Sequence, residues 1–361
     1  MYQSFELRNF RCFRELTITD MERVNLIAGV NNIGKTALLE ALFLHCGAYN
    51  PALTLRLNAF RGIESAKIEL RGLAEMPWDS IFSGFDTSQH VELVGKNEQT
   101  GQRILWLKVV RQPQELTTIG QFVQSGPEGA GSIPTSLETL QVLELDYEDG
   151  RGQRGSYYVV LDQKGVRAEP IPPPPPSPAF FLAARTRIPL TEDAERFGKM
   201  EIIGQQDVLS EALQVIEPRL RRLAVVVAGG VPMVHGDVGL GRLVPLPLMG
   251  EGMARLASLV LAIGNARSGV VLVDEVENGL HHSILPQVWQ AIDKVSRQFA
   301  TQVFATTHSL ECITAAHQAF SESEHYAFRL HRLERVQDTI RAITYDQEAL
   351  AAAIDTGLEV R

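Results

Sequence analysis

Residues 29–36 have the types and spacing of a phosphate-binding loop. Gly29-Val-Asn-Asn-Ile-Gly34-Lys35-Thr36 fits the pattern G-x-x-x-x-G-K-[ST]. The glycines allow backbone N–H groups to turn toward a phosphate, and a helix that begins at Lys35 directs its positive end to the same oxygens. Lys35 can reach the β- and γ-phosphates, and the Thr36 hydroxyl suits Mg²⁺. The expected ATP-binding residues are Gly29, Asn31, Asn32, Ile33, Gly34, Lys35, Thr36 and Ala37. The alternative is a glycine turn with a surface lysine.

Two adjacent carboxylates follow an apolar run later in the chain. Val270–Val273 predicts a buried strand that ends at Asp274 and Glu275. Ligands in open α/β sheets lie at the carboxyl ends of strands. We expect Asp274 to hold Mg²⁺ and Glu275 to polarise the attacking water as a general base. The alternative is a strand that ends in a polar turn.

A histidine follows the next predicted strand. His308 comes after Gln302–Thr306 and Thr307, in what we expect to be the same sheet. A histidine there can donate to the γ-phosphate and hold the attacking water. The predicted catalytic residues are therefore Glu275, His308 and Lys35, and the alternative for His308 is a structural role.

A second glycine-rich turn opens a predicted long helix at 252–266. Gly250, Glu251 and Gly252 lie at its start, and a glycine turn that leads into a helix N-terminus can bind an anion. A second phosphate site has no obvious task within the same chain, but it could cap the ATP bound to another copy. The alternative is an ordinary helix start.

The elements around these motifs predict an α/β fold. A short strand at 24–28 precedes the phosphate loop, and a helix over 37–45 follows it. Strands and helices alternate after residue 179, which indicates a parallel sheet. The expected elements there are a strand at 179–184, helices at 206–224, 252–266 and 285–298, and strands at 270–273 and 302–306.

The middle of the chain has a different pattern. Short apolar runs at 66–70, 103–110, 140–145 and 157–161 predict an antiparallel sheet inserted over 60–165, with a loop at 120–136. Five consecutive prolines, Pro172 to Pro176, predict an extended connector over 166–178. We therefore divide the single unit 1–361 into this insertion, this connector and a second half of the core over 179–361.

Composition limits the classes of function. The net charge is −9, unlike that of a strongly basic DNA-binding module, although a local basic groove remains compatible with it. No long uncharged apolar run predicts a membrane span, and the first residues do not form a signal peptide. Three scattered cysteines predict reduced thiols, so we expect a cytoplasmic protein.

The motif order resembles that of an ABC-type ATPase head, and more narrowly that of stand-alone AAA ATPases grouped with the OLD (overcoming-lysogenization-defect) family. The segments that carry the likeness are Phe5–Phe13, Met249–Met253, Asp274–His281 and Gln302–Ser309. The resemblance implies a P-loop ABC-type head with an antiparallel β lobe and a parallel core sheet. It also implies ATP-dependent dimerisation, with the segment Glu277–His281 at the dimer seam.

Two features depart from the family pattern. Leu248 and Met249 stand where the signature often begins with serine, so a hydroxyl contact to the partner's γ-phosphate is missing. The segment after His308 is short and carries no clustered acidic residues, so we expect no nuclease domain of the kind OLD nucleases have. Gln89 is the candidate for the glutamine that links Mg²⁺ to the β lobe. Arg61 and Arg185 face either the nucleotide, a partner or a surface carboxylate.

These expectations combine into an ATPase switch. Two or more copies would assemble around ATP and act on a separate effector protein, in anti-phage defence or DNA maintenance, with DNA as an additional partner to test and no membrane. The alternatives are a nucleotide-gated scaffold with negligible turnover, an ABC transporter subunit and a small-molecule kinase. The kinase leaves the signature and His308 unexplained.

Overall fold

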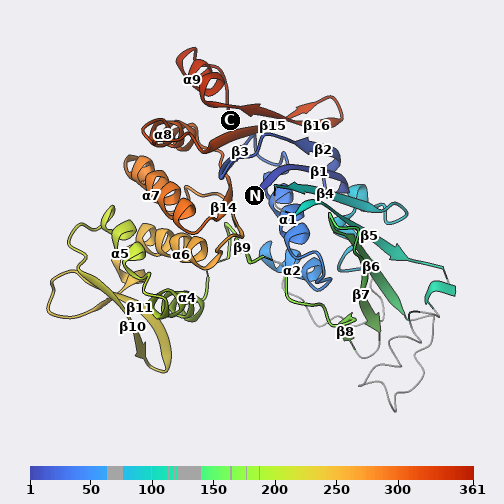
Figure 1. Cartoon of the computed structure of the whole chain (residues 1–361), viewed down its shortest axis with the longest axis horizontal. Helices are drawn as coiled ribbons and strands as arrows, with labels where there is room; N and C mark the ends of the chain where they lie inside the picture. Colours follow the sequence, from blue (N-terminus) through green and yellow to red (C-terminus); the bar gives the residue numbers. More distant parts are fainter. Residues whose placement is uncertain are drawn as a thin grey trace.

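The computed structural model describes residues 1–62, 76–98, 100–112, 114–116, 119, 140–162, 165–175, 177–186 and 188–361. Figure 1 shows a sheet in the middle of the molecule, with helices on one side and a second, antiparallel sheet on the other. A third, smaller sheet lies beside the helices. This arrangement agrees with the predicted α/β head that combines a parallel core sheet with an antiparallel β lobe.

The central sheet has six strands in the order β16-β15-β3-β14-β13-β9. All neighbouring pairs are parallel except β15 with β16. Its strands are β3 (Val24–Ala28), β9 (Ala179–Leu182), β13 (Val270–Val273), β14 (Gln302–Thr306), β15 (Phe328–Val336) and β16 (Thr339–Tyr345). The order places β14 between β3 and β13, so the phosphate loop, the paired carboxylates and His308 all follow neighbouring strands at the same sheet edge.

Both faces of this sheet are buried. Val271 and Val273 pack into the core formed with the outer helices, whereas Leu272 between them packs against α1 and the second sheet. Alternate side chains of a strand point to opposite faces, so an uninterrupted apolar run is what a strand covered on both sides requires. The helices are α1 (Lys35–Cys46), α2 (Leu53–Phe60), α4 (Leu190–Ile202), α5 (Asp207–Gln214), α6 (Glu251–Asn265), α7 (Leu285–Gln298), α8 (Leu310–Ser321) and α9 (Gln347–Asp355).

The second sheet is antiparallel and has seven strands in the order β2-β1-β4-β5-β6-β7-β8. They are β1 (Tyr2–Phe10), β2 (Phe13–Ile18), β4 (Val91–Asn97), β5 (Gly101–Val110), β6 (Gln141–Glu148), β7 (Arg154–Asp162) and β8 (Gly165–Glu169). The N-terminal hairpin therefore joins the strands of the inserted segment in one sheet. The strand expected at 66–70 and the whole loop expected at 120–136 lie outside the described residues.

Two expectations about elements were wrong. The helix predicted over 206–224 ends at Gln214, and β10 (Arg222–Ala228) begins where the helix was expected to continue. Pro218 disfavours helical backbone in the residue before it, and the run Val225–Val227 favours a strand. Strand β10 pairs with β11 (Val231–Asp237), which pairs with β12 (Val244–Pro245). The connector predicted from residue 166 begins later, because β8 extends to Glu169 and pairs with β7.

Short 3₁₀ segments complete the fold at Asp79–Ile81, Ser83–Phe85, Leu246–Met249 and His282–Ile284. The third of these, η4, leads directly into α6, which carries the second glycine turn. Within the described residues, no helix is both long enough and apolar enough to span a bilayer.

Candidate active site

The phosphate loop joins β3 to α1 and requires glycine at Gly34. A side chain there would place its Cβ 2.6 Å from Cys12 Sγ and 2.6 Å from Phe13 Cζ, and the backbone has φ +106°. The turn between β1 and β2 therefore packs directly against the loop. Lys35 Nζ donates to the carbonyls of Gly29 at 2.6 Å and Val30 at 3.1 Å. Burial lowers the pKa of Lys35, while the nearby carboxylates of Asp274, Glu275 and Glu277 oppose that shift.

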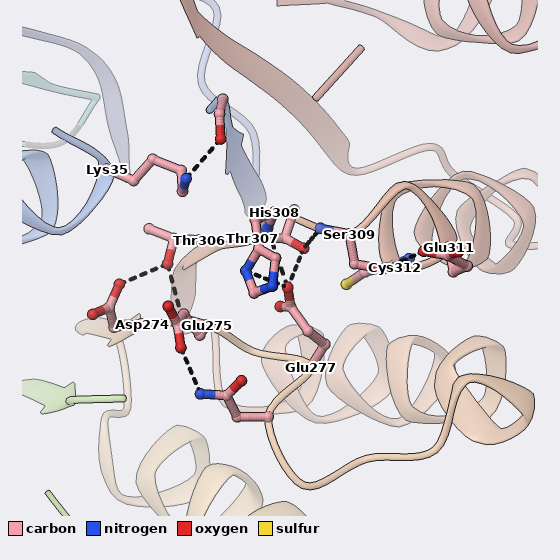
Figure 2. A network of polar contacts seen from close by, with 12 residues as sticks. Lys35, Asp274, Glu275, Glu277, Thr306, Thr307, His308, Ser309, Glu311 and Cys312 are labelled. Atoms are coloured by element: carbon pink, nitrogen blue, oxygen red, sulfur yellow. Dashed lines mark hydrogen bonds and ion pairs between the residues drawn. The ribbon is translucent and has the colours of Figure 1, made fainter. Parts of the chain in front are cut away.

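Thr36 and Asp274 come together from distant parts of the chain. Thr36 Oγ1 lies 3.0 Å from each Asp274 carboxylate oxygen, and Thr306 Oγ1 donates to Asp274 Oδ1 at 2.7 Å. Asp274 is 7% exposed, and burial raises the pKa of its carboxyl group. Figure 2 shows Asp274, Glu275 and Thr306 beneath Lys35, with Thr306 between the carboxylates.

Thr306 connects both carboxylate residues, and its replacement by valine tests that connection. Its hydroxyl also accepts from the Glu275 backbone N–H at 2.8 Å. Thr306→Val would leave a buried amide without an acceptor and would remove one of the two hydroxyl donors of Asp274, so we expect a loss of about 1–3 kcal/mol in the free energy of unfolding. Urea unfolding measures it. Thr356→Val, at the exposed end of α9, is the control, and a loss equal to that of the control would contradict the assigned contacts.

Glu275 has an unusual backbone conformation. Its φ is +50°, a left-handed value that is uncommon for residues other than glycine. Asn278 Nδ2 donates to Glu275 Oε2 at 2.7 Å, which fixes the carboxylate from the far side of the turn. Strained residues of this kind cluster at functional sites.

The carboxylate of Glu277 holds His308 in place. From the sequence, Glu277 was expected only as part of the segment at the dimer seam. Glu277 Oε1 accepts from Thr307 Oγ1 at 2.7 Å and from the His308 backbone N–H at 3.1 Å, and it lies 3.4 Å from His308 Nδ1. The His308 side chain is half exposed, whereas the Glu277 side chain is largely buried. Glu277 therefore orients the histidine (Figure 2).

Arg255 is a second residue that the sequence did not single out. Its Nη2 donates to the backbone carbonyl of Asp274 at 2.9 Å and approaches that of Glu275 at 3.4 Å. Burial lowers the pKa of this guanidinium, and the neighbouring carboxylates oppose the shift. The signal available in the sequence was a basic residue in the first turns of α6.

The second glycine turn lies beside the residues expected at the dimer seam. Gly250 has φ +121°, and a Cβ on Gly252 would lie 3.1 Å from the carbonyl oxygen of Gly279. Glu251 begins α6 between them. Leu248 is 78% exposed, so this surface presents an apolar side chain directly before the helix start.

Among the residues that the structure describes, the others that were named from the sequence form no hydrogen bond or ion pair with the residues of this site. Arg61 forms a salt bridge with the fully buried Glu40 at 2.7 Å, and Arg11 pairs with the same carboxylate at 2.6 Å. Gln89 donates to Asp86 in an exposed loop, and Arg185 is exposed after β9. Arg61 therefore forms a salt bridge, but its partner is a buried carboxylate and not the surface carboxylate that was expected.

Comparison with known proteins gives the family context. Residues 1–76 match the family model "AAA ATPase domain", and residues 160–313 match "AAA domain, putative AbiEii toxin, Type IV TA system". Two segments of the chain are therefore similar to AAA-type ATPase domains. An ATP/GTP phosphatase of Helicobacter pylori is 22% identical to it over 351 residues, which are 90% of each chain.

Solved structures similar to this chain include Smc heads. An Smc head domain from Pyrococcus furiosus, with an extended coiled coil and bound to the C-terminal domain of ScpA, has a TM-score of 0.50 at 10% identity over 98% of both chains. An SmcHead bound to the C-winged helix domain of ScpA has a TM-score of 0.49 at 11% identity, over 98% of this chain and 99% of the other. The fold is that of an α/β P-loop ATPase head.

The residues of this site are compatible with Mg²⁺. Within the described part of the chain, no group of three or more His, Cys, Asp or Glu residues could hold a metal by itself. Mg²⁺ in phosphate sites is usually held by one or two protein oxygens together with phosphates and water. The Thr36 hydroxyl and the Asp274 carboxylate are hard oxygen ligands at hydrogen-bond distance from each other, and an added cation would favour the ionised form of the buried Asp274.

Proposed function

We propose that this chain binds ATP with Mg²⁺ and hydrolyses it to ADP and phosphate. The observation that carries the proposal is the convergence of three strand ends. Lys35 and Thr36 follow β3, Asp274 and Glu275 follow β13, and His308 follows β14, which lies between those two strands. The similarity to an ATP/GTP phosphatase over 90% of the chain supports hydrolysis.

Each residue has a chemical role in this proposal. The phosphate loop amides and Lys35 bind the β- and γ-phosphates once the ammonium leaves the carbonyls of Gly29 and Val30. Glu275 accepts the proton of the attacking water, and His308, oriented by Glu277, donates to the γ-phosphate. When bound, Mg²⁺, held by Thr36 and Asp274, would neutralise phosphate charge.

The proposed site is completed by a second copy. Gly250, Glu251 and Gly252 would cap the γ-phosphate of ATP bound to the partner, because a helix N-terminus offers unpaired N–H groups and a positive dipole end. The high exposure of Leu248 supports an accessible signature surface. The resulting homodimer, or a larger homo-oligomer, would form with ATP and separate after hydrolysis.

Leu248→Asp tests the capping by the second copy. We expect ATP binding to stay unchanged and the ATP-dependent dimer to be lost, because a carboxylate at this exposed position would repel the partner's γ-phosphate. Light-scattering mass measurements with and without ATP give the result. Leu358→Asp, at another exposed leucine, is the matched control. Dimerisation of Leu248→Asp with the affinity of the control would refute capping at this surface.

The wider role is a switch for a separate effector. We place it in anti-phage defence or DNA maintenance, with DNA as a partner to test, on the resemblance of the motifs to OLD-type ATPases. The match of residues 160–313 to a family described by a putative toxin of a Type IV TA system is in line with a defence setting. Purification of the tagged Glu275→Gln protein in the presence of ATP tests whether an effector protein binds to it. If the ATPase is recovered without a second protein, this role is contradicted.

A further inference from the structure

A polar cavity of about 160 Å³ lies at the edge of the parallel sheet opposite the phosphate loop. Val270 and Gln302, the first residues of β13 and β14, line it, whereas the proposed catalytic residues follow the other ends of these strands. Tyr2 and Arg103 line it from the antiparallel sheet. A cavity needs only about 10–15 Å³ to hold one water molecule, so this one has room for a small ligand.

Two arginines of the cavity wall have buried donors without acceptors. Arg23 Nη1 and Arg103 Nε are both shielded from solvent and have no hydrogen-bond partner in the described part of the chain. Arg103 uses Nη2 to donate to Tyr2 Oη at 2.9 Å. Glu98 also lines the cavity, but it is exposed and forms no ion pair with either guanidinium. Burying unpaired charged donors is costly, so an anion that neutralises the two guanidiniums would offset part of that cost.

Gln302 and Tyr2, two further polar residues of the wall, are already hydrogen-bonded. Gln302 Oε1 accepts from the Tyr2 backbone N–H at 2.7 Å, and its Nε2 donates to the carbonyls of Tyr2 and Glu22. Tyr2 Oη also bonds His45 Nδ1 at 2.8 Å. Burial holds the pKa of His45 well below its ordinary value, so the imidazole adds no charge. The unpaired donors of the two guanidiniums thus lie in a wall whose Gln302 and Tyr2 side chains are held by these hydrogen bonds.

We propose that this cavity binds a small oxyanion, carrying a phosphate or carboxylate group, between Arg23 and Arg103. Guanidinium groups pair with both kinds of oxyanion through two parallel hydrogen bonds. The bound anion would contact Arg103 of the antiparallel sheet and lie beside Gln302 of the parallel sheet. It would therefore stabilise the junction of the two sheets and raise the unfolding temperature.

Titration with inorganic phosphate and with succinate tests the site and separates the two sources of the anion. The protein is the full chain with Lys35→Ala, so that the phosphate loop contributes little. We expect saturable binding by calorimetry and a rise in unfolding temperature with one of the two anions. Arg23→Gln on this background should weaken that binding by about tenfold or more, as expected for the loss of a charge-assisted hydrogen bond. Arg221→Gln, at an exposed arginine, should leave it unchanged.

Arg23→Gln removes no side-chain hydrogen bond within the described chain, so the unliganded variant should unfold at the temperature of its parent. Arg103→Lys is the second variant, because lysine retains a donor for Tyr2 but lacks the paired geometry. The proposal is overturned if neither phosphate nor succinate binds. It is also overturned if Arg23→Gln and Arg103→Lys bind the anion as tightly as the Arg221→Gln control. Since every arm lacks Lys35, this outcome is independent of ATP hydrolysis.

Discussion

Glu275→Gln is expected to lower phosphate release by about 10²- to 10⁴-fold while ATP still binds, because the amide cannot accept the proton of the attacking water. The substitution keeps the shape of the side chain. A glutamine carbonyl can still accept from Asn278 Nδ2, and the backbone bond to Thr306 does not involve the side chain. Steady-state phosphate release and nucleotide titration together measure the effect. The variant should also accumulate as a dimer with ATP, since the state before hydrolysis persists.

Glu311→Gln is the matched control for this experiment. Glu311 is exposed at the start of α8 and accepts from Ser309 Oγ, outside the set that contacts Asp274. The wild-type rate also separates the two leading hypotheses. A switch requires measurable phosphate release, whereas a nucleotide-gated scaffold would show negligible release and the same trapped dimer. If Glu275→Gln releases phosphate at the wild-type rate, Glu275 is not the general base.

Lys35→Ala is expected to weaken ATP binding by about 100-fold or more. The ammonium makes charge-assisted contacts with two phosphates in the proposed complex, and each such hydrogen bond contributes about 1.5–3 kcal/mol. Within the described residues, Lys35 hydrogen-bonds two carbonyls of its own loop and no other group, so its removal should cost little stability without nucleotide. Calorimetric titration with ATP gives the affinity, and thermal unfolding checks the fold.

Lys294→Ala controls for the loss of a lysine, because Lys294 pairs with Glu211 at an exposed site on α7. Its ATP affinity should equal that of the wild type. Nucleotide binding at this loop is contradicted if ATP raises the unfolding temperature of Lys35→Ala as much as that of the wild type.

The sequence alone predicted the parts of the site that depend on neighbouring residues. The phosphate loop has a fixed spacing, and a fully apolar run before paired carboxylates predicts a doubly buried strand, so β3, α1, β13 and β14 were recognisable. Helix α7 was predicted with the bounds that the structure has. These features are local, because each depends on the backbone conformation and the burial of residues that are adjacent in the sequence.

Tertiary structure decided which distant groups meet. Glu277 follows β13 and His308 follows β14, and the two residues meet because these strands are neighbours in the sheet. Arg255 reaches Asp274 only because α6 packs against that sheet. The pairing of Glu40 with Arg11 and Arg61 likewise joins three separate segments. Such contacts involve side chains far apart in the sequence, where spacing carries no signal and packing alone determines the partner.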